Sequence, residues 1–414
     1  MIRWITETLG TCGGDRDSVP AGAVSVDVRD LVDKGGNAAA AVRERIDRAV
    51  DALRAKKTVV VHCDYGISRS NSVAAGALAL FEGISFSDAV RRVVAATGET
   101  SIKIDVLATV RQAIAPNPAG GPPAGRRILV TGGSGFVGAA LLPLLPGLVV
   151  APASREIDLL RDVVLLDLVA REHAVDTVIH LATPRIYTTN DSLGVALTHL
   201  KNVLDVCRAN DATLVYVSSW EIYSGYRSSA LIADESLPAL PGGTYGQTKL
   251  LCETLIEQHR RRYGLRCLLL RSSPVYGAAS DRPRFIRNFL AKARRGEAIV
   301  THRYRNGPPA LDLLHVDDLR RAVGVAVERR IEGVLHVGTG RLTSTAEVAS
   351  IVCRAVGSTS TIGVAKIDEE VGNIAMDAGR AHRLLDWRPA ISVEDGLAEL
   401  IARSAGDAPG RTTD

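Results

Sequence analysis

Two groups of residues in this sequence have the types and the spacing that chemistry needs. The first is the stretch HCDYGISRS, in which Cys63 ends an apolar run and Arg69 follows six residues later. A turn between a strand and a helix directs backbone N–H groups at one point, attracts an anion there, and lowers the pKa of a thiol. Gly66 permits the sharp turn, and the planar guanidinium of Arg69 suits two phosphate oxygens. We therefore expect a thiolate that attacks a phosphate.

This stretch resembles the signature of the cysteine-dependent tyrosine and dual-specificity phosphatases. That signature is His-Cys, five residues, then Arg-Ser or Arg-Thr, and it matches here through His62, Cys63, Gly66, Arg69 and Ser70. The resemblance implies that Cys63 forms a phosphocysteine, that Arg69 binds the phosphoryl oxygens, and that Ser70 assists hydrolysis of the intermediate. The stretch therefore predicts a phosphatase domain.

Phosphate ester cleavage also needs an acid that protonates the leaving alkoxide. The phosphatase resemblance implies an aspartate on a loop after an earlier strand. Asp30, at the end of VSVDVRD, is the best candidate, with Asp33 and Asp27 as alternatives. The resemblance covers residues 1 to 114, and the segment before this strand is short for the family. The substrate therefore ranges from a phosphoprotein to a phosphorylated sugar or nucleotide.

The second group begins with RILVTGGSGFVG, a strand that runs into a glycine turn. Gly132 permits a tight turn, Gly135 lets the backbone approach a pyrophosphate, and Gly138 lets the following helix pack closely. The pattern predicts a dinucleotide site. Ser154 and Arg155 stand where an NAD-selective site usually has an acid, and an arginine there suits a 2′-phosphate. We expect NADP, with NAD as the alternative.

Tyr245 and Lys249 lie four residues apart on a predicted helix and therefore share one face. An ammonium beside a phenol lowers the phenol pKa from about 10 toward neutrality, which makes the phenol a usable proton donor or acceptor. Ser219, at the end of its strand, is expected to bind the same substrate oxygen. Glu221, two residues later, is a candidate second acid or base.

The residues after 126 resemble the extended short-chain dehydrogenase/reductases, in the branch of NAD-dependent epimerases and dehydratases that act on nucleotide sugars. The motifs VIHLAT, LLRSSPVYG, LLHVDDLRRAV and VLHVGTG extend this likeness to about residue 400. The resemblance implies epimerase or dehydratase chemistry first and an NADPH-dependent reductase second. The cofactor-binding residues that these patterns imply are Gly132, Gly135, Phe136, Val137, Gly138, Ser154, Arg155, Asp158, Leu181, Ala182, Tyr245 and Lys249.

One departure concerns the substrate's diphosphate. Members of the family often bind it with an arginine at the position of Leu311, just before Asp312. Other cations must replace that arginine if the substrate is a nucleotide sugar. The candidates are Arg284, Arg287, Arg303 and Arg305.

The elements that position both groups follow from the hydrophobic pattern. Short apolar strands alternate with helical segments in both halves, which predicts α/β folds with parallel sheets. The run APNPAGGPPAGR at 115–126 predicts a linker. We therefore expect a small phosphatase-like α/β domain (1–114), then a Rossmann-type doubly wound sheet with a smaller C-terminal substrate lobe (127–405), and a flexible tail (406–414).

Composition excludes several classes of protein. The 50 Lys and Arg residues nearly balance the 46 Asp and Glu residues, so the net charge of +4 does not indicate a nucleic-acid or membrane partner. The six cysteines show no metal-ligand spacing, and no metal is expected. We expect a cytoplasmic bifunctional enzyme with a phosphorylated or nucleotide-linked small-molecule substrate. A homodimer is compatible with the sequence.

Overall fold

The computed structural model describes residues 1–14, 19–115, 125–184, 186–187, 189–280 and 282–404. Most of the expected linker and all of the expected tail lie outside these residues. By its internal contacts the chain divides into two compact units. The first unit comprises Met1–Arg127, Ser154–Asp176 and Asn202–Ala212, and the second comprises Ile128–Ala153, Thr177–Lys201 and Thr213–Asp414.

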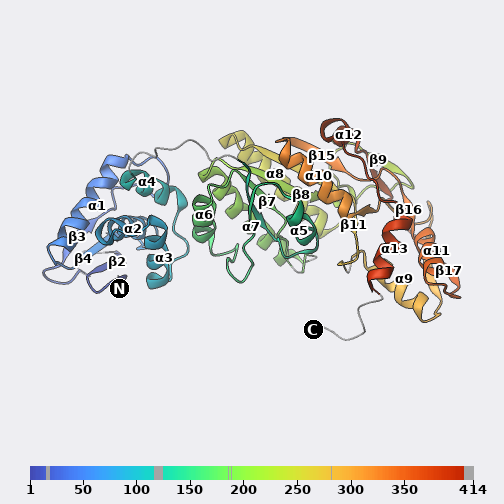
Figure 1. Cartoon of the computed structure of the whole chain (residues 1–414), viewed down its shortest axis with the longest axis horizontal. Coiled ribbons are helices and arrows are strands. Elements are labelled where there is room, and N and C mark those ends of the chain that lie inside the picture. Colours follow the sequence, from blue (N-terminus) through green and yellow to red (C-terminus); the bar gives the residue numbers. More distant parts are fainter. Residues whose placement is uncertain (15–18, 116–124, 185, 188, 281, 405–414) are drawn as a thin grey trace. The chain divides into compact units, whose positions relative to one another are not determined.

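The first unit is built on a four-stranded sheet (Figure 1). In spatial order its strands are β1 (Arg3–Trp4), β2 (Leu9–Gly13), β4 (Val59–Cys63) and β3 (Val24–Asp27). The predicted parallel arrangement holds for β2, β4 and β3, whereas β1 joins β2 in the antiparallel direction. All five residues of β4 are buried, which explains its continuous apolar run.

Four helices accompany this sheet, and α2 packs against β2 and β4 as well as against the other three. They are α1 (Ala39–Arg54), α2 (Arg69–Glu82), α3 (Phe86–Thr97) and α4 (Ile104–Ile114). Helix α3 is capped by Ser85, whose Oγ accepts a hydrogen bond from Asp88 N–H at 3.0 Å. Helix α2 begins at Arg69, directly after the cysteine loop, so the helix fixes the backbone of this residue.

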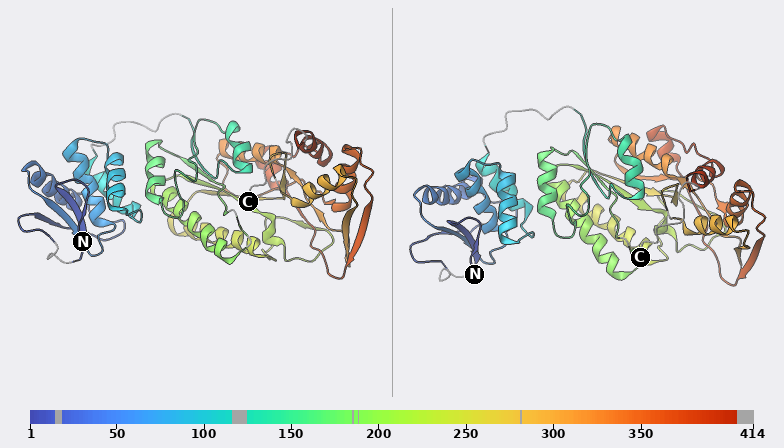
Figure 2. Two further views of the ribbon diagram at one scale, coloured as in Figure 1. Left: turned by 90° about the horizontal axis from the view of Figure 1, so that it is seen from below. Right: turned by 60° about the horizontal axis from the view of Figure 1, so that its bottom comes forward.

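The second unit contains a six-stranded parallel sheet, as the sequence predicts. In spatial order its strands are β15 (Gly333–Val337), β10 (Cys267–Ser272), β8 (Thr213–Ser219), β7 (Thr177–His180), β5 (Arg127–Thr131) and β6 (Leu148–Val150). Figure 2 shows α8 on one side of this sheet and α5 with α10 on the other. This doubly wound arrangement is of the Rossmann type.

The second unit also holds the helices α5 (Phe136–Leu141), α8 (Thr244–Tyr263), α9 (Arg284–Arg294), α10 (Val316–Glu328), α11 (Thr345–Ala355), α12 (Gly379–Leu385) and α13 (Val393–Ser404). By the same division α6 (Val163–Glu172) falls in the first unit, and α7 (Asn190–Ala209) begins in the second unit and ends in the first. Four strand pairs complete the unit: β11 (Val275–Tyr276) with β14 (Leu314–His315), β12 (Ile299–Tyr304) with β17 (Ile362–Ile367), β13 (Ala310–Leu311) with β16 (Thr343–Ser344), and β18 (Ile374–Met376) with β9 (Leu231–Ala233). Helices α9, α11 and α13 share an apolar cluster separate from that of the sheet.

The order of the strands determines where a ligand binds. Strand β5 lies between β6 and β7, so the chain reverses the direction in which it adds strands at β5. In open α/β sheets the carboxyl ends of the strands at such a reversal form a ligand-binding crevice. Here those ends carry the glycine turn after β5 and the Leu181–Ala182 segment after β7. No helix within the described ranges is long and apolar enough to cross a membrane.

Candidate active site

The cysteine loop of the first unit is held in place by two glycines. Gly66 has a φ of +69°, and a Cβ on it would lie 2.4 Å from Gly13 N. A Cβ on Gly13 would in turn lie 2.4 Å from the carbonyl carbon of Tyr65. The end of β2 and the loop after β4 therefore approach each other so closely that neither glycine tolerates a side chain, which confirms the sharp turn expected at Gly66.

Hydrogen-bond donors surround the thiol of Cys63 in this loop. Gly66 N–H donates to Cys63 Sγ at 3.2 Å, and Ser70 Oγ lies 3.3 Å from the same sulfur. Burial raises the pKa of the Cys63 thiol, but hydrogen bonds from the Ser70 side chain and from the N–H groups of Ser70, Gly66 and Tyr65 outweigh burial, and the pKa is lowered. The loop therefore favours a thiolate.

Arg69 connects this loop to the segment that carries the candidate acids. Its Nη1 donates to the carbonyls of Arg29 at 2.8 Å and Leu31 at 2.9 Å, and its Nη2 pairs with Asp64. The Nε atom is buried and has no hydrogen-bond partner among the described residues. The residue is only 7% exposed, so this N–H donor is shielded from solvent.

The three candidate acids have different surroundings. Asp27 binds the Arg29 guanidinium, and this hydrogen bond lowers the pKa of Asp27 to about 2, so Asp27 is ionised and unsuited to donate a proton. Asp30 pairs with Arg45, and it lines an open surface groove together with Asp64. Asp33 pairs with Lys103 at 3.3 Å through one oxygen, while its other oxygen is buried without a hydrogen bond. Asp30 and Asp33 thus stay candidates.

In the second unit the glycine turn packs against the end of β7. Gly132 has a φ of +76°, and a Cβ on it would lie 2.6 Å from Ala182 N. A Cβ on Gly138 would lie 2.4 Å from Gly132 O, so α5 begins directly against the turn. Gly135 has an ordinary φ of −74° and more room, since its nearest contact would be Gly132 O at 3.2 Å. Local packing therefore requires glycine at positions 132 and 138. It does not explain the glycine at position 135.

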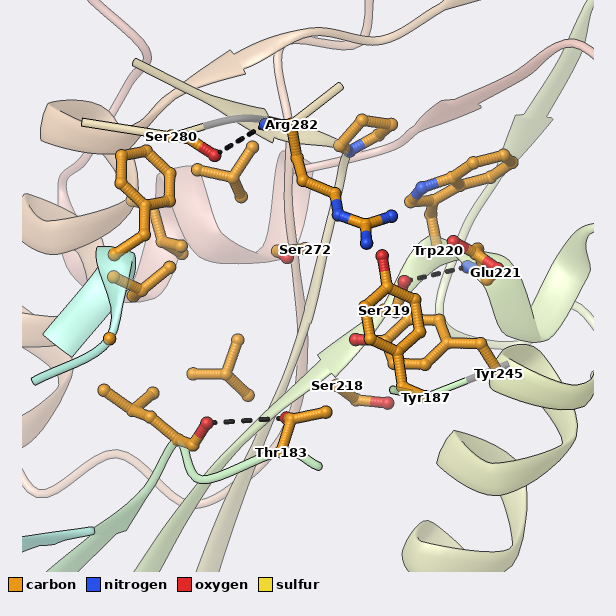
Figure 3. Close-up of a pocket in the computed structure, with 18 of the residues that line it drawn as sticks. Thr183, Tyr187, Ser218, Ser219, Trp220, Glu221, Tyr245, Ser272, Ser280 and Arg282 are labelled. Carbon is orange, nitrogen blue, oxygen red and sulfur yellow. Dashed lines mark hydrogen bonds between the residues drawn. The ribbon is translucent and has the colours of Figure 1, made fainter. Parts of the chain in front are cut away.

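A cavity of about 730 Å³ opens beside this turn (Figure 3). It brings together most of the residues that the sequence singles out. Those that line it are Gly132, Gly135, Phe136, Val137, Gly138, Leu181, Ser219, Glu221, Tyr245 and Lys249. Ala182 lines a small adjoining cavity that also contacts Tyr245 and Lys249.

Lys249 is buried beneath the cavity and held by two acceptors. Its Nζ donates to Val217 O at 2.9 Å and to the Tyr216 hydroxyl at 3.2 Å. Burial lowers the pKa of Lys249 to about 8. Nearby acidic groups, including Glu253 and Glu221, act in the opposite direction but do not outweigh burial. The ammonium therefore carries its charge at neutral pH and loses it in mildly alkaline solution.

Tyr245 lies above this lysine, with Lys249 Nζ 5.6 Å from the centre of its ring. Burial raises the pKa of Tyr245, and the nearby Glu221 and Tyr187 raise it further. Our prediction that Lys249 brings this pKa toward neutrality is therefore wrong for the chain by itself. The physical reason is that Nζ donates to Val217 and Tyr216, while the phenol loses its solvation. The hydroxyl is protonated and suited to donate.

Ser219 and Glu221 follow β8 at the edge of the cavity. Ser219 Oγ accepts a hydrogen bond from Glu221 N–H at 3.2 Å, which caps the short 3₁₀ helix η3 (Trp220–Tyr223) and orients the Ser219 side chain. Burial raises the pKa of Glu221, and Arg282 and Lys249 counteract this only in part. Glu221 is therefore a carboxyl whose proton is held more tightly than usual.

The sequence does not predict three residues that line the cavity or hold a residue that lines it. Tyr187 packs against Tyr245 with 4.7 Å between ring centres, and Arg282 lies 4.6 Å from the centre of the Tyr187 ring. Tyr216 supports Lys249 from below. Tyr187 and Arg282 lie in loops, where periodicity carries no signal. Tyr216 has a signal in its position three residues before Ser219 on the same strand.

The comparison with known proteins agrees with this geometry. The profile of the NAD dependent epimerase/dehydratase family matches residues 128–338, a little more than half of the chain. The chain belongs to this family. A Bacillus subtilis relative described as uncharacterized UDP-glucose epimerase YtcB is 25% identical over 313 residues, covering 67% of this chain and 97% of that one. A dTDP-glucose 4,6-dehydratase of Streptomyces griseus is 28% identical over 195 residues, covering 46% of this chain and 58% of that one, less than two thirds of its length.

Solved structures share the fold of this epimerase/dehydratase. The UDP-glucose 4-epimerase of Thermus thermophilus, solved as a complex with NAD, has a TM-score of 0.59 and 23% identity. The match covers 68% of this chain and all of that one. At this level of identity the likeness establishes the shared fold.

Family membership implies a nicotinamide dinucleotide, and the glycine turn of this epimerase/dehydratase fits one. Gly132 and Gly138 allow the turn to pack closely against its neighbours. Gly135 lines the cavity, and without a side chain it leaves the backbone there accessible to a ligand. Pyrophosphate binding requires this combination of a helix N-terminus and an unobstructed backbone. Ser154, Arg155 and Asp158 belong to the other contact unit, so their contact with the dinucleotide stays a prediction.

The structure also separates the four candidate diphosphate cations of this epimerase/dehydratase. Arg284, like Leu311, lines the cavity. Arg287 binds Ser280 O, Ala278 O and Ser404 Oγ, so it fastens α9 and is not directed at a substrate. Arg303 and Arg305 lie on β12 and after it, away from the residues that line the cavity. Asp312 is fully buried and accepts hydrogen bonds from the Thr339, Gly340 and Met376 N–H groups, which is a structural role.

Proposed function

We propose that the second unit is an NAD(P)-dependent epimerase or dehydratase that acts on a nucleotide sugar. The observation that supports this most directly is the single cavity shared by Ser219, Tyr245, Lys249 and the glycine turn. The two relatives above are described by names that specify a UDP- and a dTDP-linked glucose. Of the four cations that the sequence offers in place of an arginine at Leu311, Arg284 is the one that lines the cavity, so it is our candidate for binding the diphosphate.

The residues of the chain divide the chemistry among them. A bound nicotinamide dinucleotide supplies a reversible hydride acceptor. Tyr245 exchanges the proton of the sugar hydroxyl that is oxidised, and Ser219 holds that oxygen in line. Lys249 keeps a positive charge beneath the phenol, which favours the phenolate at the moment the proton moves. Because the Tyr245 pKa is raised in the chain alone, this proton exchange depends on the assembled complex.

Glu221 decides between the two reaction types. A dehydratase needs an acid or base beside the oxidised carbon, and a carboxyl with a raised pKa is suited to that task. Epimerisation at the oxidised carbon needs no second acid, so Glu221 would then be structural. Simple NADPH-dependent reduction is the second proposal. It rests on the predicted contact of Arg155 with the 2′-phosphate of NADPH.

Turnover in deuterium oxide distinguishes these reactions. An elimination beside the oxidised carbon exchanges the neighbouring proton with solvent, so mass spectrometry of the product should find one deuterium that disappears with Glu221→Gln. An unlabelled product with unchanged Glu221→Gln turnover would assign epimerisation. Consumption of NADPH in stoichiometric amounts would assign reduction.

We further propose that residues 1–114 form a cysteine-dependent phosphatase domain, joined by a 115–126 linker to a 127–405 epimerase/dehydratase domain. The lowered pKa of Cys63 and the buried Arg69 Nε donor support catalysis rather than passive phosphate sensing. In this proposal Cys63 is the nucleophile, Arg69 binds the phosphoryl group, Ser70 assists hydrolysis and Asp30 is the acid. A phosphoprotein substrate is the alternative to a phosphorylated metabolite.

Hydrolysis of an aryl phosphate tests the phosphatase proposal. Cys63→Ser should abolish phosphate release and leave dinucleotide binding unchanged, because the two sites lie on separate sheets. Wild-type turnover by Cys63→Ser would refute the cysteine mechanism. An inactive wild-type chain that still binds inorganic phosphate through Arg69 would instead support a phosphate sensor.

A further inference from the structure

A row of buried side chains crosses the parallel sheet beneath the cavity of the second unit, and the mechanism above gives this row no task. Thr131, His180 and Tyr216 lie side by side on β5, β7 and β8, because Thr131 pairs with His180 and His180 with Tyr216 in the strand register. The Thr131 hydroxyl and His180 Nδ1 are hydrogen bonded at 2.6 Å, and the His180 ring stacks on the Tyr216 ring with 5.9 Å between centres. Burial lowers the pKa of His180 to about 3, so this imidazole is neutral and holds the Tyr216 ring by contact and not by charge.

The hydroxyl of Tyr216, at the end of this row, meets the Lys249 ammonium. Lys249 Nζ donates to this hydroxyl at 3.2 Å and to Val217 O at 2.9 Å, and it lies 4.7 Å from the centre of the Tyr216 ring. Within the described part of the chain, the Tyr216 hydroxyl is the one side-chain group that accepts a hydrogen bond from Nζ. Burial raises the pKa values of Tyr216 and of the neighbouring Tyr245, so both phenols are protonated and bring no negative charge.

The other ionisable groups that face Lys249 are already committed or uncharged. Cys252 hydrogen bonds to Tyr216, and burial raises its pKa, so it is a neutral thiol. Glu253 and Glu221 raise the pKa of Lys249 by their charge, but Glu253 is paired with Arg271 at 2.8 Å. Burial raises the pKa of Glu221, so this carboxyl holds its proton more tightly than usual.

We propose that Tyr216 is a positioning residue of the epimerase/dehydratase site, whose hydroxyl holds the Lys249 ammonium beneath Tyr245 and keeps it charged. A hydrogen-bond acceptor stabilises the ammonium and not the neutral amine. Without this acceptor, the buried ammonium has one partner fewer and releases its proton at a lower pH. The inference rests on the proposed function, in which the charge of Lys249 favours the phenolate of Tyr245.

Nuclear magnetic resonance of the full-length chain, labelled with ¹³C at the lysine Cε atoms, measures this charge without any substrate. The Lys249 signal is assigned by its loss in Lys249→Arg. We expect the signal to titrate near pH 8 in the wild type and about one pH unit lower in Tyr216→Phe, which keeps the ring and removes the hydroxyl. Tyr276→Phe is the matched control and should leave the midpoint unchanged, because Tyr276 is fully buried in the separate cluster of α9, α11 and α13.

The pH dependence of sugar oxidation links this charge to the reaction. In Tyr216→Phe the rate should decline about one pH unit earlier than in the wild type and regain most of the wild-type value at about pH 6. A merely structural defect would lower the rate at every pH. If Tyr216→Phe does not fold, 3-fluorotyrosine at position 216 replaces it. This residue keeps the hydroxyl but makes its oxygen a poorer acceptor, so the midpoint should move in the same direction by a smaller amount.

The outcomes separate this inference from the proposed function. An unchanged Lys249 midpoint in Tyr216→Phe, or an equal shift in Tyr276→Phe, would refute the role of Tyr216. A shifted midpoint with an unmoved alkaline limit of sugar oxidation would refute it too, because the reaction would not depend on this charge. A shifted midpoint in a chain that oxidises neither UDP-glucose nor dTDP-glucose would overturn the proposed function and leave Tyr216 as the residue that sets the charge of Lys249.

Discussion

Gly132 and Gly135 offer a direct test, because the structure assigns different reasons to two glycines of one turn. Alanine at position 132 must adopt a φ of +76°, which costs about 1–2 kcal/mol for an L residue. Its Cβ would also lie 2.6 Å from Ala182 N and 2.8 Å from Ala182 Cα, both backbone atoms that cannot rotate away. Overpacking of this kind costs roughly 1–3 kcal/mol more.

The sum for Gly132→Ala is a loss of about 2–5 kcal/mol in the free energy of unfolding. At about 2–4 °C per kcal/mol for a unit of this size, the melting temperature should fall by roughly 4–20 °C. Gly135→Ala meets only Gly132 O at 3.2 Å and has an ordinary φ, so its stability should change by less than about 1 kcal/mol. Its added methyl group nevertheless stands where the pyrophosphate must approach the backbone.

Calorimetric unfolding of the full chain, together with fluorescence titration with NADH and NADPH, measures both effects. Gly135→Ala should bind the dinucleotide about ten- to hundredfold more weakly while melting like the wild type, because hydrogen bonds to a charged group are worth about 1.5–3 kcal/mol. Gly132→Ala should melt early. Equal melting temperatures for the two variants, or unchanged dinucleotide affinity in Gly135→Ala, would refute this account of the turn.

Four further predictions follow from single side chains. The pKa of Lys249 lies near 8, so sugar oxidation should decline as the pH rises through about 8, and a rate that stays flat well above that pH would contradict the need for its charge. Ser70→Ala removes a donor to the Cys63 thiolate and should slow alkylation of Cys63 by iodoacetamide in mildly acidic buffer by about tenfold or more. Ser72→Ala is the control, because the Ser72 hydroxyl has no hydrogen-bond partner in the described structure. Arg155→Ala should weaken NADPH about tenfold and leave NADH unchanged, whereas equal losses would refute 2′-phosphate recognition. Asp30→Asn should slow hydrolysis of alkyl phosphates more than of aryl phosphates with good leaving groups, and an equal loss would assign the acid to Asp33.

Local sequence determined much of this protein. The cysteine loop and the glycine turn each depend on a few consecutive residues whose backbone needs, a bare Cα at Gly66 or Gly132, are visible in the sequence itself. The spacing of Tyr245 and Lys249 places both on one helical face, and the alternation of apolar strands with helices sets a parallel sheet. Because parallel strands end at a common edge, the meeting of Ser219 with the glycine turn also follows from the pattern.

Tertiary structure alone decided how those residues interact. The sequence does not show that Lys249 donates to Val217 and Tyr216, or that burial raises the pKa of Tyr245, because both depend on strands distant in the chain. Arg282 and Tyr187 enter the cavity from loops, whose paths are fixed by packing and carry no periodicity. The exclusion of Asp27 as an acid also came from the structure, although Arg29 is only two residues away, because the sequence does not show the hydrogen bond that lowers the pKa of Asp27. Spacing fixes which side chains share a surface, whereas burial and long-range contacts fix their charge and their partners.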